Sequence, residues 1–401
     1  MRTKKTVLVY RNELLPVSET FIKEQILALR DWRAVLVGRK KVNQLPLDSL
    51  DVRLIGPAST GLFDALLWKS QQALGVVPPH VKRVLARERP SLIHAHFGVD
   101  ALDAWPLARA LNLPMLVTLH GYDINTHREW WEAGKGGSDM HRYPTHLLEL
   151  AKQPRVGFIA VSEAIRRRAI EFGIAAEKVF VRYIGIDSSR FAPGPVPIDQ
   201  RPARVLFVGR LVEKKGCRYL IQAVAQVQEN VPGCELIIIG DGPLREELEQ
   251  LARSLRVSAT FLGARSNGEV KHEMDNARVF CLPSVTAESG DAEGLPISIL
   301  EAQASGIPVI TSARGGVGEA VRDELSGLTF AEGDVSALAS KLRAILVDDD
   351  RARELAAETA RFVASSFDIR PLTAKLEALY SFTASQSERV SNLSFGKEHA
   401  T

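Results

Sequence analysis

Short apolar segments alternate with longer amphipathic stretches through the first half of the chain. Residues 7–10, 92–96 and 115–119 are largely apolar. Runs of this length are typical of strands buried on both faces of a parallel sheet. Residues 18–29 and 81–88 have the apolar spacing of helices, with Ser18 as a predicted N-cap. This pattern predicts an α/β domain.

The same alternation restarts after residue 203. The predicted strands of this second part are 205–208, 235–239, 260–262, 279–282 and 308–311. The predicted helices are 219–228, 244–255, 269–276 and 296–304, followed by three more at 335–347, 351–365 and 369–380. A second α/β domain is therefore expected, and its last helix could cross back to the first domain.

Residues 186–203 contain four prolines and one glycine, a composition typical of a linker. We therefore predict an N-terminal domain at residues 1–185, a linker at 186–203 and a C-terminal domain at 204–383. Residues 384–401 are polar and are expected to form a disordered tail. Both domains have a doubly wound, Rossmann-like pattern, so a ligand is expected in a cleft between the carboxyl ends of the two sheets.

Length and composition agree with two cytoplasmic domains. A chain of 401 residues exceeds what one hydrophobic core usually organises. Its three cysteines, Cys217, Cys234 and Cys281, have neither metal-binding nor disulfide-framework spacing, which favours a reducing compartment. No apolar run is long enough for an export signal or a membrane span, so we expect a cytoplasmic protein.

Charge is distributed unevenly between the two halves. Residues 1–185 contain 27 Lys and Arg against 18 Asp and Glu, whereas the remainder contains 24 against 30. The basic half, with Arg166-Arg167-Arg168, Lys82-Arg83 and Trp130-Trp131, suggests peripheral contact with an anionic membrane. A simple solvated surface explains the same charges equally well. The small overall charge of +3 and the lack of a recognition motif argue against nucleic-acid binding.

The loop after the strand at 205–208 has the residues of an anion site. Gly209 and Gly216 allow tight turns, and Arg210 and Lys215 supply positive charge just before a helix. A diphosphate would suit such a site. An isolated loop of this kind is more often a solvated turn, so the prediction depends on the motif that follows.

The most specific motif comes after the strand at 279–282. Glu293, Gly294 and Leu295 precede a predicted helix that starts at Pro296, and Glu301 lies about two turns beyond Glu293. Amides at a helix start can bind phosphate oxygens, and a carboxylate can accept two neighbouring ribose hydroxyls. The glycine-rich turns at 240–243 and 315–318 lack the GxGxxG pattern, which argues against an NAD enzyme.

Histidines provide the candidate chemistry of the first half. His120 ends the strand at 115–119 and precedes a glycine, so we expect it to face the cleft. His94 and His96 lie two apart on a strand and share one face. No carboxylate or cysteine accompanies them at ligand spacing, so we expect no metal. The run Asp348-Asp349-Asp350 is expected to be an acidic loop between helices rather than a cation site.

Together these segments resemble the retaining GT-B glycosyltransferases of family 4, in order and over nearly the whole chain. The stretch Ser18-Glu19-Thr20, with His-Ala-His-Phe-Gly at 94–98, is most similar to the exopolysaccharide branch of colanic acid and amylovoran synthesis. The other matching segments are 120–123, 160–162, 185–187, Phe191, 207–211, Lys215-Gly216, 239–243, 261–263, the Glu293/Glu301 pair and Gly315-Gly316.

The resemblance implies roles for individual residues. Arg210 and Lys215 would hold the donor diphosphate, and Glu301 the ribose hydroxyls. Glu293, with the amides of Gly294 and Leu295, would meet the sugar and phosphate, and His120 would reach the sugar from the other domain. The catalytic set implied is thus Glu293, His120, Arg210 and Lys215, acting without a metal or other cofactor.

The acceptor side is less defined. Ser18, Glu19 and His96 are the candidate acceptor residues. The loop at 11–17 lacks the glycines that many relatives use against the donor phosphate, so acceptor contacts there are as plausible as donor contacts. A saccharide or a lipid-diphosphate-linked oligosaccharide would be the acceptor.

The expected activity is transfer of a hexose from a nucleotide diphosphate sugar, with a UDP-sugar favoured and with retention. Two other functions remain open. A sugar-nucleotide 2-epimerase of the same architecture would consume the donor without an acceptor. A non-catalytic sugar-nucleotide-binding protein would bind the donor and transform nothing.

Overall fold

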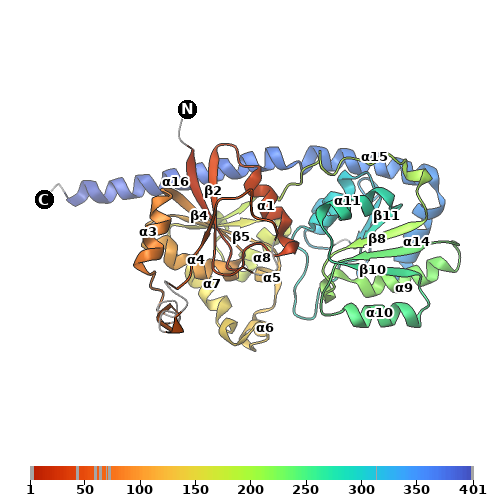
Figure 1. The fold of residues 1–401 in the computed structure, drawn as a ribbon, viewed down its shortest axis with the longest axis horizontal. Coiled ribbons are helices and arrows are strands. Elements are labelled where there is room, and N and C mark those ends of the chain that lie inside the picture. Colours follow the sequence, from red (N-terminus) through yellow and green to blue (C-terminus); the bar gives the residue numbers. More distant parts are fainter. Residues whose placement is uncertain are drawn as a thin grey trace. The chain divides into compact units, whose positions relative to one another are not determined.

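The structure is a computed structural model, and it describes residues 4–398 other than 42–44, 58–60, 63–65, 69, 71–73 and 313. The chain divides into two compact units, each with its own parallel sheet (Figure 1). Unit 1 comprises residues 1–161, 165–183 and 370–401, and unit 2 comprises 162–164 and 184–369. The prediction of two α/β domains with doubly wound sheets is confirmed.

The sheet of unit 1 has the strand order β3-β2-β1-β4-β5-β6-β7, and all its pairs are parallel. Its central strands are apolar because helices cover both faces of a sheet of this kind. The strands are β1 (Lys5–Tyr10), β2 (Trp32–Gly38), β3 (Val52–Leu54), β4 (Pro90–His96), β5 (Met115–Leu119), β6 (Val156–Ala160) and β7 (Val179–Val181). The helices include α1 (Thr20–Leu27), α3 (Pro79–Arg87), α4 (Gly98–Ala110), α5 (Tyr122–Asn125), α6 (Arg128–Glu132), α7 (Tyr143–Ala151) and α8 (Glu163–Phe172).

The sheet of unit 2 has the order β10-β9-β8-β11-β12-β13, also entirely parallel. Its direction of winding reverses between β8 and β11, the place where open α/β sheets bind ligands. The strands are β8 (Arg204–Val208), β9 (Glu235–Ile239), β10 (Ala259–Gly263), β11 (Val279–Leu282), β12 (Val309–Ser312) and β13 (Leu328–Phe330). The helices are α9 (Cys217–Gln228), α10 (Arg245–Ser254), α11 (Asn267–Asn276), α12 (Ile297–Ala304), α13 (Val317–Ala320), α14 (Val335–Val347) and α15 (Asp349–Ser366).

The last helix, α16 (Ile369–Glu398), returns to unit 1, as the sequence suggested. Leu376, Leu379, Tyr380 and Ala384 are buried in the same core as the strands of unit 1. Their spacing places them on one helical face. On the same helix, Glu377 Oε1 accepts the backbone N–H groups of three successive residues, Arg30, Asp31 and Trp32, at 2.8–2.9 Å.

Two predicted boundaries differ from the structure. The segment predicted as a linker, 186–203, packs on unit 2, because its Phe191 and Ile198 are buried and its Arg201 donates to the carbonyl oxygens of Met274 and Ala277. The prolines limit its conformation without preventing this packing. The second difference is the C-terminal domain: residues 370–383 belong to unit 1 because α16 packs there.

The tail predicted to be disordered from residue 384 continues α16 as far as Glu398. Polar composition lowers the chance of a packed core, but between residues 384 and 395 the sequence contains neither proline nor glycine to end a helix that has already begun. Ser18 also differs from its predicted role. It lies in a short 3-10 helix (Val17–Glu19), and α1 starts without a side-chain cap.

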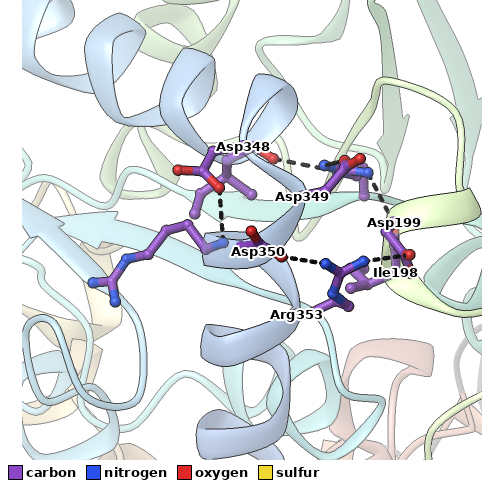
Figure 2. Close-up of polar contacts among 9 residues, drawn as sticks. Ile198, Asp199, Asp348, Asp349, Asp350 and Arg353 are labelled. Atoms are coloured by element: carbon purple, nitrogen blue, oxygen red, sulfur yellow. Dashed lines mark hydrogen bonds and ion pairs between the residues drawn. The ribbon is translucent and has the colours of Figure 1, made fainter.

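Of the acidic run Asp348–Asp350, predicted as a loop between helices, only Asp348 lies between α14 and α15, because α15 begins at Asp349. Contacts within unit 2 occupy all three carboxylates (Figure 2). Asp348 caps α15 by accepting the N–H of Arg351 at 2.9 Å. Asp349 pairs with the buried Arg278 at 2.5 Å, and Asp350 pairs with Arg353. The three carboxylates therefore stabilise the junction between two helices.

Candidate active site

Three consecutive residues after β8, Glu213–Lys215, hold the loop that follows β11. Lys214 Nζ pairs with Asp291 at 2.9 Å, and Lys215 Nζ pairs with Glu293 Oε1 at 2.7 Å. The two loops leave neighbouring parallel strands, so their residues meet at the carboxyl edge of the sheet. This edge brings together the predicted residues Lys215 and Glu293, which are 78 positions apart.

The backbone of this edge is closely packed. Gly216 has φ +64° and separates the short 3-10 helix (Glu213–Lys215) from α9. A Cβ atom at Gly216 would lie 1.8 Å from the carbonyl oxygen of Pro283. Both the positive φ and the contact require glycine, so the predicted tight turn is present and presses one loop against the other.

Glu293 is a buried carboxylate, with 8% of the residue exposed. Burial alone would raise its pKa, but Lys215 and then Lys214 outweigh burial, and the pKa of Glu293 lies below its usual value. Its Oε1 contacts Lys215 as an ion pair but receives no well-aligned hydrogen bond from the described residues. Glu293 therefore remains ionised at neutral pH and retains hydrogen-bonding capacity.

Asp291 differs from Glu293 although it also pairs with a lysine. Burial raises the pKa of Asp291 more than Lys214 lowers it, and the Glu293 charge raises it further. The pKa values of the two carboxylates are thus shifted in opposite directions, with that of Asp291 raised and that of Glu293 lowered. Lys214 and Asp291 were not among the predicted site residues, although Asp291 lies two positions before Glu293 and Lys214 directly before Lys215.

Gly294 and Leu295 lead into α12, as predicted. Pro296, predicted as the first helical residue, is the N-cap, and α12 starts one position later at Ile297. Leu295 is 6% exposed, and Glu301 is half-buried in the middle of α12. The free amides of the helix start lie in the chain between Glu293 and Glu301.

The glycine pair after β12 closes on this segment. A Cβ atom at Gly316 would lie 1.6 Å from the carbonyl oxygen of Gly294, and one at Gly315 would lie 3.1 Å from that of Glu293. The Gly315-Gly316 turn therefore contacts the backbone of Glu293 and Gly294. The sequence alone gave only a weak indication of a role for these glycines, and this close packing explains why side chains are absent there.

Arg210 lies on the same loop as Lys215 and is exposed. Its guanidinium makes no hydrogen bond or ion pair with the part of the chain that the structure describes. Gly240, after β9, packs against this loop, since a Cβ atom there would lie 1.9 Å from the carbonyl oxygen of Gly209. Unit 2 thus presents a fixed backbone, an accessible arginine and a lysine beside an anionic glutamate.

In unit 1, three histidines gather at the carboxyl ends of β4 and β5. The rings of His94 and His96 lie 4.3 Å apart, which confirms that they share a face, and His96 Nδ1 lies 3.1 Å from His120 Nε2. Tyr380 and Thr118 occupy the two ring nitrogens of His94 at 2.6 Å each. With both of its nitrogens engaged, His94 is not arranged as a metal ligand.

Burial keeps these histidines neutral. It lowers the pKa of His94 to about 3 and the pKa values of His96 and His120 well below their usual range. His120 is half-buried, and its ring contacts those of Phe97 and Phe21. The buried Asp123 accepts the N–H groups of His120 and Gly121 at 3.0 Å, which fixes the turn that carries the His120 ring.

The three predicted acceptor residues differ in their exposure and in their contacts. Glu19 is 7% exposed and receives two hydrogen bonds from Arg11, which also pairs with the buried Asp100. Burial raises the pKa of Asp100 to about 6, although Arg11 opposes this. Glu19 is therefore committed to Arg11, whereas Ser18 is exposed. His96, 2% exposed, contacts His120 rather than solvent.

Sequence comparison identifies the family. Residues 189–362 match the sequence model of the group 1 glycosyl transferases, and residues 51–190 match that of glycosyltransferase family 4. A Mycobacterium tuberculosis glycogen synthase is 30% identical over 304 residues, which cover 75% of this chain and 70% of that protein. The chain belongs to the group 1 glycosyltransferases of family 4.

Two further comparisons describe the relatives of this glycosyltransferase. An Escherichia coli protein named as the colanic acid biosynthesis glycosyltransferase WcaL is 29% identical over 296 residues, which cover 73% of this chain and 70% of WcaL. The crystal structure of HepE from Anabaena, in complex with UDP and glucose, superposes with a TM-score of 0.77 at 20% identity and covers 94% of this chain and 99% of HepE. The expected GT-B fold is confirmed.

Several of the residues on which membrane contact was predicted for this glycosyltransferase are not available at its surface. Trp131 is 1% exposed and packs against Trp130 and Tyr143, so it cannot enter a lipid layer without unfolding. Within Arg166–Arg168, only Arg167 is exposed, and Arg168 contacts Glu171 and the carbonyl oxygen of Ile124. Trp131 therefore does not support the predicted membrane contact, because its packing partner Tyr143 lies outside the local sequence.

Lys82 and Arg83 on α3 are exposed, in contrast to Trp131. Among the described residues no helix is both long and apolar enough to cross a bilayer. The same residues contain no cluster of three or more His, Cys, Asp or Glu side chains able to hold a metal ion.

Proposed function

We propose that this glycosyltransferase transfers a hexose from a nucleotide diphosphate sugar, with a UDP-sugar favoured, and retains the anomeric configuration. The observation that carries the proposal is the ion pair of Lys215 with Glu293, which joins the loop that also carries Arg210 to the segment that leads into α12. Two cations and free helix amides suit a diphosphate. An ionised glutamate beside them suits the hydroxyl groups of the attached sugar.

The same groups support a leaving-group mechanism. Arg210, Lys215 and the amides of Gly294 and Leu295 would stabilise the charge that develops on the departing diphosphate. Glu293 stays ionised and is paired with Lys215, so it would orient the sugar rather than donate a proton. In this proposal the leaving phosphate accepts the proton of the acceptor hydroxyl, and the new bond forms on the face that the phosphate leaves.

His120 is proposed to contact the sugar of the donor. Because its pKa is strongly lowered, its ring is neutral and can form a hydrogen bond to a sugar hydroxyl without adding charge. Glu301 would bind the ribose hydroxyls. No metal is required in this proposal, because the cationic side chains and helix amides neutralise the diphosphate.

Donor binding can be tested with UDP-, GDP- and ADP-sugars by thermal shift. A ligand that binds only the folded protein raises the melting temperature. A shift with UDP-sugars that disappears in an Arg210→Ala/Lys215→Ala double variant is the expected result. Equal stabilisation of the variant and the wild type would place the donor elsewhere. Undiminished turnover in excess EDTA is expected in the transfer assay.

The stereochemical outcome and the two rival functions can be separated in one experiment. Proton NMR of the glycoside product reports the configuration of the new anomeric bond, and the expected product has the configuration of the donor. Donor isomerisation in the absence of any acceptor would instead indicate a 2-epimerase. Donor binding with neither hydrolysis nor transfer, across a panel of saccharide acceptors, would indicate a binding protein.

The acceptor proposed is a saccharide or a lipid-diphosphate-linked oligosaccharide in exopolysaccharide synthesis, with WcaL as the supporting relative. A lipid-linked acceptor requires contact with a membrane. The surface of unit 1 suits such contact, because Leu62, Leu66 and Leu74 are 86%, 66% and 78% exposed. Exposed apolar side chains followed in the chain by the cationic helix α3 match an anionic lipid surface.

Vesicle co-sedimentation tests this surface. Anionic vesicles should bind the protein better than neutral phosphatidylcholine vesicles, and a Leu62→Ser/Leu66→Ser variant should lose most of the binding. Leu325→Ser is the matched control, since Leu325 is 62% exposed but lies in unit 2. Equal loss in both variants, or no preference for anionic lipid, would remove the membrane proposal and leave a soluble saccharide acceptor.

A further inference from the structure

A cavity of about 800 Å³, open to solvent, lies in unit 2. Its lining includes Val285 and Thr286 of the loop that carries Glu293, together with Phe330 at the end of β13 and Glu332 just after it. Val285 is buried and its N–H donates to the carbonyl oxygen of Lys214 at 2.8 Å, whereas Thr286 is exposed. Close packing therefore does not fix the loop at Thr286, and polar contacts must hold it there.

Glu332 makes the most extensive of these contacts. Its Oε1 accepts the backbone N–H of Thr286, and its Oε2 lies 3.5 Å from the Thr286 hydroxyl. Arg314, which follows β12, pairs with Glu332 at 3.0 Å. One carboxylate thus ties together the ends of two strands and the loop after a third.

Glu213 holds the next part of the same loop, because its Oε1 accepts the N–H of Glu288 at 3.1 Å. Beyond this point the loop reverses, with the N–H of Ala287 bonded to the carbonyl oxygen of Asp291 at 2.9 Å. The reversal places Asp291 opposite Lys214 and Glu293 opposite Lys215. The position of Glu293 therefore depends on where residues 286–288 are fixed.

We propose that Glu332 is a positioning residue of this glycosyltransferase, which sets the place of Glu293 by anchoring Thr286 across the cavity. The proposal rests on the function proposed above, in which Glu293 contacts the sugar of the donor. Glu332 itself touches neither Glu293 nor the cations for the diphosphate. Its removal should therefore weaken recognition of the sugar while leaving recognition of the nucleotide diphosphate nearly intact.

Calorimetric titration with UDP-glucose and with UDP separates these effects. For Glu332→Ala we expect the Kd of UDP-glucose to rise about tenfold, the loss typical of one charge-assisted contact, and the Kd of UDP to stay within about twofold. Glu332→Gln keeps one acceptor oxygen for the Thr286 N–H and should recover part of the loss. If a different nucleotide sugar gives the largest thermal shift, the titrations use that nucleotide sugar in place of UDP-glucose and its nucleoside diphosphate in place of UDP.

Glu249→Ala is the matched control. Glu249 is 29% exposed against 21% for Glu332 and also pairs with an arginine, but it lies on α10 away from the loop. The proposal is overturned if Glu332→Ala and Glu249→Ala behave alike, or if Glu332→Ala weakens UDP and UDP-glucose equally. A wild-type protein that binds the donor and transfers no sugar would instead overturn the proposed function, and the binding comparison would still decide the role of Glu332.

Discussion

Lys215 Nζ lies 2.7 Å from Glu293 Oε1, and the two side chains are 16% and 8% exposed. Lys215 is therefore the main source of charge compensation for the buried Glu293, and Lys214 is the second. A diphosphate bound at this edge would share the Lys215 ammonium with Glu293. The pair links recognition of the phosphate to recognition of the sugar, and changing either residue should affect both.

Replacement of Lys215 by alanine should lower the rate of transfer by about 100-fold or more, because the lost charge acts on the leaving group in the transition state. Glu293→Gln keeps the shape and should also lower turnover strongly. The measurement is the initial rate of transfer at saturating donor, compared between each variant and the wild type. Lys271→Ala is the control, since Lys271 forms a similarly exposed ion pair with Asp275 on α11. Near wild-type turnover in either site variant would contradict the assignment.

Substitution of Gly316 by alanine should displace residues of the proposed donor site, although Gly316 is not itself proposed to contact the donor. The new Cβ atom would lie 1.6 Å from the carbonyl oxygen of Gly294, so the turn or the start of α12 must move. We expect the KM for donor to rise at least about tenfold, since sub-ångström misplacement of binding groups is costly. Gly318→Ala is the control, because no atom lies within 4 Å of its Cβ position. Equal kinetics of the two variants would show that the contact is unimportant.

Much of this site could be predicted from the sequence because its signals are local. Glycine and proline mark the turns, and the apolar run before Glu293 marks the strand that positions it. Glu301 was placed on the right helix for the same reason. Only the N-cap position of Pro296 differed, by one residue.

The contacts that could not be predicted join distant parts of the chain. Lys214 and Asp291 are 77 positions apart, and which charge meets which depends on the path of both loops. The buried state of Trp131 depends on Tyr143 of another helix. In the segment 186–203, composition indicated restricted backbone freedom, but only the packing of residues such as Phe191 shows where the segment lies.

The return of α16 to unit 1 provides a stability prediction. Glu377 Oε1 accepts three backbone N–H groups and is buried, so Glu377→Ala leaves three donors without a partner. We expect the free energy of unfolding of unit 1 to fall by about 3 kcal/mol. All five tryptophans lie between residues 32 and 131, so tryptophan fluorescence during urea unfolding reports on unit 1 alone. Glu377→Gln, with one acceptor retained, should lose less, and an equal loss would contradict the role of the acceptor.

The buried histidine cluster predicts how stability depends on pH. His94 has a pKa of about 3 in the folded protein against its usual 6.5. Between these values the unfolded chain binds a proton that the folded protein excludes, so stability is lost as the pH falls below about 6.5. From pH 6.5 to pH 5 this contribution is about 2 kcal/mol. Asp100 acts in the opposite direction, because its pKa, raised to about 6, favours proton uptake by the folded state.

Urea unfolding followed by tryptophan fluorescence at pH 6.5 and pH 5 checks the sign. The wild type should lose stability on acidification, and in His94→Gln the loss should be smaller by about 2 kcal/mol, because glutamine cannot titrate. His94→Gln also removes the ring that contacts Tyr380, so the variant should be less stable at both pH values. The informative quantity is therefore the difference between the two pH values. An unchanged difference would mean that His94 already carries its proton inside the folded protein.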